Sequence, residues 1–403
     1  MDARPDPFPC PVGVEGTWGL DPAVAYLNHG SFGACPRAVL ALQSRLRDEL
    51  EREPMDFLWR QLPRRLADAR AALALFLDCD PDELAFVPNA TTGVATVVGA
   101  LELAAGDELL TTDHAYGACR RVLERAAGRA GARVVAARVP FPLDDPGQVV
   151  EAVLGAATPR TRLALLDHLT SATGLVLPVE PLVAALEGRG IPVLVDGAHA
   201  PGSIPLDLAR LAASYYTGNA HKWLCAPKGA AFLHVRADRR AGLHPLVVSH
   251  GYDPAATAPR FREEFDWTGT LDPTPALCIP ECVRLLGALL PGGWAALMAR
   301  NRALALAARE LLGERLGVAA PAPASMIATL ATVPLPAPAA GAPAAGLDGS
   351  GIMDWLRERA VESFVAPAPG DGRLLVRVSA QVYNDLGQFG RLADLLATAL
   401  GRG

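Results

Sequence analysis

Long apolar runs are missing from this sequence, because charge, glycine or proline interrupts each hydrophobic stretch well short of a membrane span. Residues 1–19 contain neither a basic segment nor an apolar core of the signal-peptide type, so we expect a cytoplasmic location. Excess positive charge is missing too, since the formal net charge is -6 and the pI is about 5.8. We therefore expect neither a nucleic-acid partner nor a membrane partner.

Paired cysteines are also absent. The seven cysteines are odd in number, scattered along the chain and never arranged as Cys-x-x-Cys. This pattern argues against a structural zinc site and against a disulfide framework, and we predict no metal site. Cys278 and Cys282 have the spacing of one helix face, and we interpret them as small core residues.

The middle of the chain alternates short apolar runs with helical stretches. Residues 161–167 (TRLALLD) and 191–196 (IPVLVD) are almost continuously apolar, which is typical of strands buried on both faces of a parallel sheet. Residues 178–189 lie between them and are predicted to form a helix that has proline near its start. The alternation predicts an open α/β sheet. Further strands are expected at residues 84–87, 108–112, 133–139, 215–218 and 230–235, and further helices from residue 92 and at residues 117–128.

A chain of 403 residues is long enough for one large domain and one smaller domain. The pattern changes after Cys278, where two helical stretches precede a Pro/Ala/Gly-rich segment at residues 334–346. A helix, a strand at residues 374–379 and a final helix follow. We predict an N-terminal segment (1–30) that packs on the small domain, a large domain (31–278) and a small α+β C-terminal domain (279–403).

Two polar motifs follow two of the predicted strands. VDGAH places Asp196 at the end of a buried strand, and NAHKW places Lys222 just after a later strand. Open α/β sheets bind ligands beyond the carboxyl ends of their strands, so the two groups can reach one crevice. Pyridoxal 5'-phosphate (PLP) needs such a pair, with an amine for its aldehyde and a carboxylate for its ring nitrogen. Taken alone, the lysine is typical of a solvated surface charge and the aspartate of a helix N-cap. The ordered combination favours PLP.

These motifs belong to a longer series that resembles the class V aminotransferase family of fold-type I PLP enzymes, and within it the isopenicillin N epimerase-like branch. The series covers nearly the whole chain in the family's order. Its members are LNHGSFG (27–33), NATTG (89–93), DHAY (113–116), VDGAH (195–199), GNAHKW (218–223), WTGT (267–270) and RVS (377–379). The resemblance implies a central mixed, mostly parallel sheet in the large domain and PLP as the cofactor.

The resemblance also implies roles around the cofactor ring. Lys222, Asp196 and His114 are the expected catalytic residues: Lys222 carries PLP, Asp196 pairs with the ring nitrogen and His114 stacks on one ring face. The oxygen side of the ring is expected to face His199 and either Ser171 or Thr170.

The remaining expected contacts concern the phosphate and the substrate. A phosphate suits the N-terminus of a helix, and the resemblance assigns it to Ala90, Thr91, Thr92, Asn219 and His221. Thr270 resembles a threonine that reaches the phosphate of a neighbouring subunit, which implies a homodimer with shared active sites. Arg377 resembles the arginine that binds the α-carboxylate of an amino-acid substrate, although arginine two residues before serine on a strand is common. Asn28 and Ser31 belong to a segment that approaches the substrate in relatives.

The reaction itself stays open at this point. The branch predicts an amino-acid epimerase, which needs a second acid-base group opposite Lys222; His29, His114 and Tyr116 are candidates. A carbon-sulfur β-lyase or an aminotransferase of small-molecule biosynthesis needs the same parts. No cysteine follows Cys282, which disfavours desulfuration through an enzyme persulfide. The non-enzyme alternative is a PLP-binding regulatory protein, but the sequence has no DNA-binding helix-turn-helix.

Overall fold

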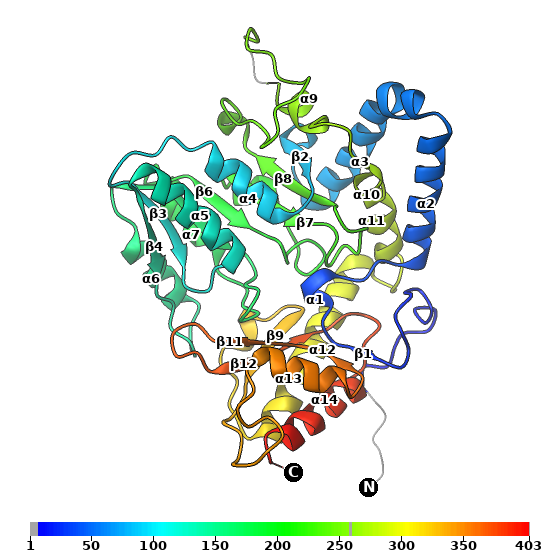
Figure 1. Cartoon of the computed structure of the whole chain (residues 1–403), viewed down its shortest axis with the longest axis vertical. Coiled ribbons are helices and arrows are strands. Elements are labelled where there is room, and N and C mark those ends of the chain that lie inside the picture. The colour runs from blue at the N-terminus through cyan, green and yellow to red at the C-terminus, as the bar shows by residue number, and fades with distance from the viewer. Residues whose placement is uncertain (1–6, 258–259, 403) are drawn as a thin grey trace.

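The computed structural model describes residues 7–257 and 260–402, and a seven-stranded sheet forms its centre (Figure 1). The strand order is β2-β8-β7-β6-β5-β3-β4. β8 runs antiparallel to both of its neighbours, whereas the other pairs are parallel. The predicted mixed, mostly parallel sheet is confirmed. Its strands are β2 (Leu84–Val87), β3 (Glu108–Thr112), β4 (Arg133–Ala137), β5 (Thr161–Asp167), β6 (Val193–Asp196), β7 (Tyr215–Asn219) and β8 (Ala231–Val235).

Helices cover both faces of this sheet, because successive residues of its central strands point to opposite sides and both sides are apolar. In β5, Leu163 and Leu165 join one core layer, whereas Ala164 and Leu166 join the other. The first layer lies under α4 (Ala90–Gly99), α5 (Gly117–Ala130) and α9 (Phe261–Asp266). The second lies under α2 (Arg37–Arg52), α3 (Leu62–Leu77), α6 (Gly147–Ala156) and α7 (Val179–Glu187).

The C-terminal part is α+β, as predicted. Its antiparallel sheet has the order β11-β12-β9, and β1 near the N-terminus pairs in parallel with β10. That pairing joins residues 25–26 to residues 361–362, and the predicted division into an N-terminal segment and two domains stays a prediction. The elements are β1 (Ala25–Tyr26), α12 (Gly293–Leu316), β9 (Leu330–Pro334), α13 (Gly349–Arg357), β10 (Val361–Glu362), β11 (Phe364–Pro367), β12 (Leu374–Ser379) and α14 (Leu386–Ala399).

α11 (Ile279–Gly287) lies between the two parts and packs on α3. Cys278 and Cys282 are fully buried in the core that α3 covers, which confirms their interpretation as small core residues. Over residues 7–257 and 260–402, no helix combines the length and the apolar character that crossing a bilayer requires.

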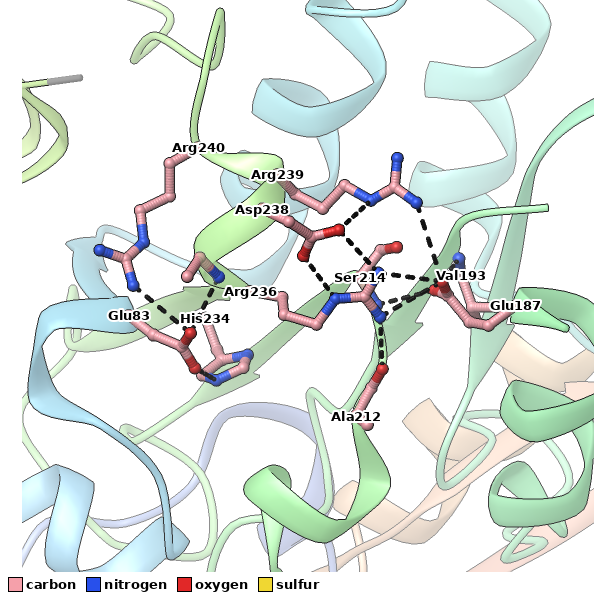
Figure 2. Close-up of polar contacts among 11 residues, drawn as sticks. Glu83, Glu187, Val193, Ala212, Ser214, His234, Arg236, Asp238, Arg239 and Arg240 are labelled. Atoms are coloured by element: carbon pink, nitrogen blue, oxygen red, sulfur yellow. Dashed lines mark hydrogen bonds and ion pairs between the residues drawn. The ribbon is translucent and has the colours of Figure 1, made fainter. Parts of the chain in front are cut away.

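A network of ion pairs lies at the amino ends of β6 and β7 (Figure 2). Glu187, the last residue of α7, accepts the backbone N–H groups of Val193 and Ser214, each at 2.9 Å. Arg236, just beyond β8, pairs with Glu187 and donates to the carbonyl of Ala212 at 2.7 Å. The network joins α7 to β6, β7 and β8 at this edge of the sheet. The opposite edge, where the parallel strands have their carboxyl ends, is free of this network.

Candidate active site

A cavity of about 490 Å³ opens at the carboxyl ends of β5, β6 and β7. Asp167, Asp196 and Asn219 are the last residues of these strands, so the sheet itself brings their side chains to the cavity. Of the residues named from the sequence, those that line the cavity are Asp196, Asn219, Ser31, Ala90, Thr91, Thr92, Tyr116, Ser171, His199, His221 and Lys222.

Lys222 supplies the amine of the cavity. Its Nζ lies 3.0 Å from Nε2 of His199. Burial, and then the positive charge of Arg377, lowers the pKa of Lys222 to about 8. A lowered pKa increases the fraction of neutral, nucleophilic amine near pH 7. Lys222 and Lys228 are the only lysines of the chain, and Lys228 instead donates to the carbonyl of Gly33 at 3.1 Å.

His199 is oriented by its contact with Trp223, whose indole N–H donates to Nδ1 at 3.5 Å. Burial holds the pKa of His199 well below its usual value, so the ring is neutral and has one proton. With Nδ1 as the acceptor, that proton lies on Nε2 and faces the amine of Lys222. An oxygen beside the amine would receive the same hydrogen bond, which fits the predicted contact of His199 with the phenolic oxygen of PLP.

Two buried carboxyl groups lie side by side at the cavity. Asp167 and Asp196 are register partners on adjacent parallel strands, and each is 3% exposed. Asp196 accepts hydrogen bonds from the thiol of Cys119 at 3.2 Å and the backbone N–H of Ala198 at 3.0 Å. Burial raises the pKa of both carboxyl groups, and the charge of Asp196 raises that of Asp167 further. A cation beside Asp196 would therefore be strongly favoured.

α4 begins at the wall of the same cavity. The side chain of Asn89 accepts the N–H of Thr92 at 2.8 Å, and this cap explains why the helix starts at Ala90, earlier than predicted. Asn219 accepts the N–H of Ala90 at 2.9 Å and ties the helix start to β7. The helix dipole attracts anions at a helix N-terminus. With the hydroxyl groups of Thr91 and Thr92, this wall suits a phosphate.

Arg377 is a buried guanidinium group without a carboxylate partner among the residues that the structure describes. Its Nη1 donates to the carbonyl of Ser171 at 2.8 Å. Its Nη2 donates to Oδ1 of Asn28 at 3.0 Å and to Oγ of Ser31 at 2.9 Å. Burial lowers the pKa of Arg377 to about 10. Asn28 and Ser31 thus hold the guanidinium group, and its uncompensated charge suits a carboxylate.

Four predicted site residues are not among those that line the cavity, namely Asn28, His114, Thr270 and Arg377, although Arg377 bonds to the lining residues Ser31 and Ser171. Nδ1 of His114 bonds to Oγ1 of Thr173 at 2.8 Å, and its ring packs edge-on against Phe141. Tyr116, two residues later, lines the cavity. Thr270 is exposed on the loop after α9. Ring stacking by His114 and a phosphate contact from Thr270 in a dimer stay predictions.

Comparisons with known proteins agree with this geometry. A family model described as Aminotransferase class-V matches residues 39–270. The chain is 38% identical to isopenicillin N epimerase of Streptomyces clavuligerus over 96% of this chain and 98% of that protein. It is 40% identical to isopenicillin N epimerase of Amycolatopsis lactamdurans over 94% of this chain and 95% of that protein.

The chain belongs to the class V aminotransferase family. This class V enzyme is also 31% identical to a probable chloroplastic L-cysteine desulfhydrase of Arabidopsis thaliana, over 93% of this chain and 83% of that protein. A structure of the cystine C-S lyase C-DES has a TM-score of 0.77 at 23% identity, covering 93% of this chain and 97% of that one. The Escherichia coli cysteine desulfurase CsdA has a TM-score of 0.77 at 20% identity, covering 96% and 97%. The predicted fold-type I architecture is confirmed.

PLP is the cofactor of this class V enzyme. Three features of the cavity fit it: the amine of Lys222 for the aldehyde, the carboxylate of Asp196 for the ring nitrogen, and the start of α4 for the phosphate. When bound, PLP supplies an electron sink for negative charge that develops at the α-carbon of an amino acid.

Asp167 is the site residue that the sequence prediction missed. The signal was present, because TRLALLD ends in aspartate as VLVD does, and neighbouring parallel strands bring their last residues together. Nothing in the sequence alone states that β5 and β6 are neighbours in the sheet, so the pairing of the two carboxyl groups needed the structure.

Asp167→Asn tests the electrostatics of this pair in the PLP-free protein. Because the folded-state pKa of Asp167 is raised, the stability due to its protonated form is complete below about pH 3.8 and is lost as the pH rises through that raised pKa. Asparagine keeps the shape without the charge. In urea unfolding, Asp167→Asn should gain stability over the wild type as the pH rises from 4 to 8.5. Asp48→Asn on the exposed surface of α2 is the control, and an equal offset at both pH values for Asp167→Asn would contradict the account.

Proposed function

We propose that this enzyme is an amino-acid epimerase that removes the α-proton and returns a proton on the opposite face. The observation that carries the proposal is the 38% and 40% identity to two isopenicillin N epimerases over nearly the full length of each chain. The site supports it, because the cavity contains an amine with a lowered pKa and Arg377 is bonded to two residues of its wall, Ser31 and Ser171.

Arg377 is assigned to the α-carboxylate of the amino acid. Two parallel N–H groups of a guanidinium group bind a carboxylate in a fixed orientation. Ser31 and Ser171 hold those N–H groups at the cavity wall. A carboxylate fixed there leaves the α-hydrogen free to face Lys222, whose amine accepts the proton. His199 keeps that amine in place through its Nε2.

Tyr116 is assigned to the opposite face. Of the three candidates in the sequence, His29 is fully buried and His114 is bonded to Thr173 away from the cavity. Tyr116 lines the cavity and is 45% exposed, so its hydroxyl is free to meet a substrate. Epimerisation then uses Lys222 on one face and Tyr116 on the other.

The assignment is tested with Tyr116→Phe in deuterated water. The wild type should both exchange the α-proton and invert a substrate from a panel of amino acids that includes isopenicillin N. Tyr116→Phe should invert at least about 100-fold more slowly, because one acid-base group is lost. It should still exchange the α-proton with retention, since Lys222 is intact.

NMR for deuterium and chiral chromatography for configuration are applied to the same samples. Inversion at the wild-type rate in Tyr116→Phe would remove Tyr116 from the mechanism. If the wild type releases keto acid without inverting any member of the panel, the epimerase proposal fails.

A carbon-sulfur β-lyase is the second candidate, and an aminotransferase would use the same groups. The identity to a probable L-cysteine desulfhydrase favours the lyase as the alternative. Elimination needs the same removal of the α-proton but no thiol of the enzyme, and no cysteine follows Cys282. Pyruvate and thiol as products would identify it.

We also propose a homodimer in which Thr270 reaches the partner's cofactor phosphate. Large apolar side chains exposed on the single chain support a subunit contact, among them Phe32 at 71%, Trp59 at 72% and Leu271 at 61%. Leu271 is next to Thr270 and lines a second cavity of about 350 Å³. A cytoplasmic location stays a prediction.

Thr270→Ala tests the shared site. We expect the affinity of the PLP-free protein for PLP to fall about 5-fold, because one of several phosphate hydrogen bonds is lost. Sedimentation should give a dimer for the wild type and for Thr270→Ala, and Thr268→Ala on the same loop is the control for PLP affinity. A fully active monomer would overturn the proposal.

A further inference from the structure

The short segment after β1 touches both functional ends of the cavity. α1 (His29–Phe32) is a single helical turn that begins after Asn28. Asn28 and Ser31 accept hydrogen bonds from Arg377 at the substrate end. His29, which lies between them, contacts the backbone of Lys222. One turn of chain therefore bridges the guanidinium group and the lysine that bears the cofactor.

The contacts of His29 define a hydrogen-bonded link. Its Nε2 lies 3.0 Å from the carbonyl oxygen of Lys222, and its Nδ1 lies 2.8 Å from the hydroxyl of Tyr383. A carbonyl only accepts, so Nε2 has the ring proton and Nδ1 accepts from Tyr383. Burial lowers the pKa of His29 to about 3, so the ring stays neutral. His29 is thus a fixed connector and not a proton-transfer group.

The residues around this link are closely packed. The ring of His29 lies 4.9 Å from that of Trp223, centroid to centroid. Gly33 has a φ of +68°, and a Cβ there would meet the carbonyl of His221 and, at 3.0 Å, the Cα of Lys222. The backbone at Gly33 therefore lies directly against the backbone of His221 and Lys222, and a displacement of one segment moves the other.

The far end of the link belongs to the same segment as Arg377. Arg377 is in β12, and Gln381 and Tyr383 follow it in the loop after that strand. The amide nitrogen of Gln381 donates to the thiol of Cys225 at 3.7 Å, and its oxygen accepts from Asn301 at 2.8 Å. The loop that continues the strand of Arg377 therefore also contacts the segment around Lys222, through Gln381 and Cys225.

We propose that His29 and Tyr383 are positioning residues, through which carboxylate binding at Arg377 sets the position of the Lys222 amine. The proposal rests on the assignment of Arg377 to the substrate carboxylate made above. It does not depend on whether the reaction is epimerisation or elimination, because both begin with the same amine.

Three variants test the link in the holoenzyme. His29→Leu removes the hydrogen bonds to Lys222 and Tyr383, along with the longer contacts of Nε2 to Gln381 and Cys225, and keeps the volume. We expect kcat to fall about 100-fold with little change in KM. Tyr383→Phe removes only the hydroxyl, with an expected fall of about 5-fold. His29→Gln offers an N–H to the carbonyl and an oxygen to the hydroxyl, so it should recover most of kcat.

A spectroscopic readout separates positioning from general damage. Propionate has a carboxylate but no amine, and in the wild type it should shift the pH midpoint of the visible absorbance of PLP bound to Lys222. In His29→Leu and Tyr383→Phe this shift should be lost, although NMR titration still detects propionate binding. His234→Gln, a buried histidine of β8 paired with Glu83, is the matched control and should keep the shift and kcat.

The outcomes are distinct. Wild-type kcat and a wild-type propionate shift in both His29→Leu and Tyr383→Phe would overturn the link. If His29→Leu does not fold, Tyr383→Phe decides by the same two measurements. Arg377→Lys should lose propionate binding itself; unchanged binding there would overturn the carboxylate assignment and with it the proposed coupling.

Discussion

Buried ionisable groups that have no ion-pair partner among the described residues are the constraint on which the rest of this site depends. At one end of the cavity, Asp167 and Asp196 share a desolvated position, and burial raises the pKa of both. At the other end, Arg377 is buried among neutral acceptors. Such arrangements are costly in an empty protein and are typical of sites that a ligand completes. A cationic ring nitrogen beside Asp196 and a carboxylate at Arg377 would supply the missing charges, and burial also lowers the pKa of Lys222 to about 8.

The fold produces this constraint in two steps. Apolar strands buried on both faces bring their polar last residues to one edge, while the Glu187 network joins the opposite edge (Figure 2). The turn of α1 then connects the small part of the molecule to Lys222, because Asn28 contacts Arg377 and His29 contacts the carbonyl of Lys222. One short segment therefore contacts both Arg377 and the backbone of Lys222.

The sequence predicted those features that depend on a local pattern of residues. Nearly continuous apolar runs located the strands, and the polar residues after them located Asp196 and Lys222. Contacts between distant segments left no such pattern: Asn28 meets Arg377 across almost the whole chain, and Asp167 meets Asp196 only because β5 and β6 are neighbours. A polar side chain has no periodic signal that gives its direction, so the contact of His29 with the carbonyl of Lys222 was not predictable either.

Attachment of PLP to Lys222 in this cavity can be tested directly. Borohydride reduction of the holoenzyme fixes the cofactor to its lysine, and mass spectrometry of the digested protein then locates it. The chain offers only Lys222 and Lys228, so the choice is binary. We expect the phosphopyridoxyl group on Lys222 and an unmodified Lys228; modification of Lys228, or of neither lysine, would overturn the assignment of the cofactor to this cavity.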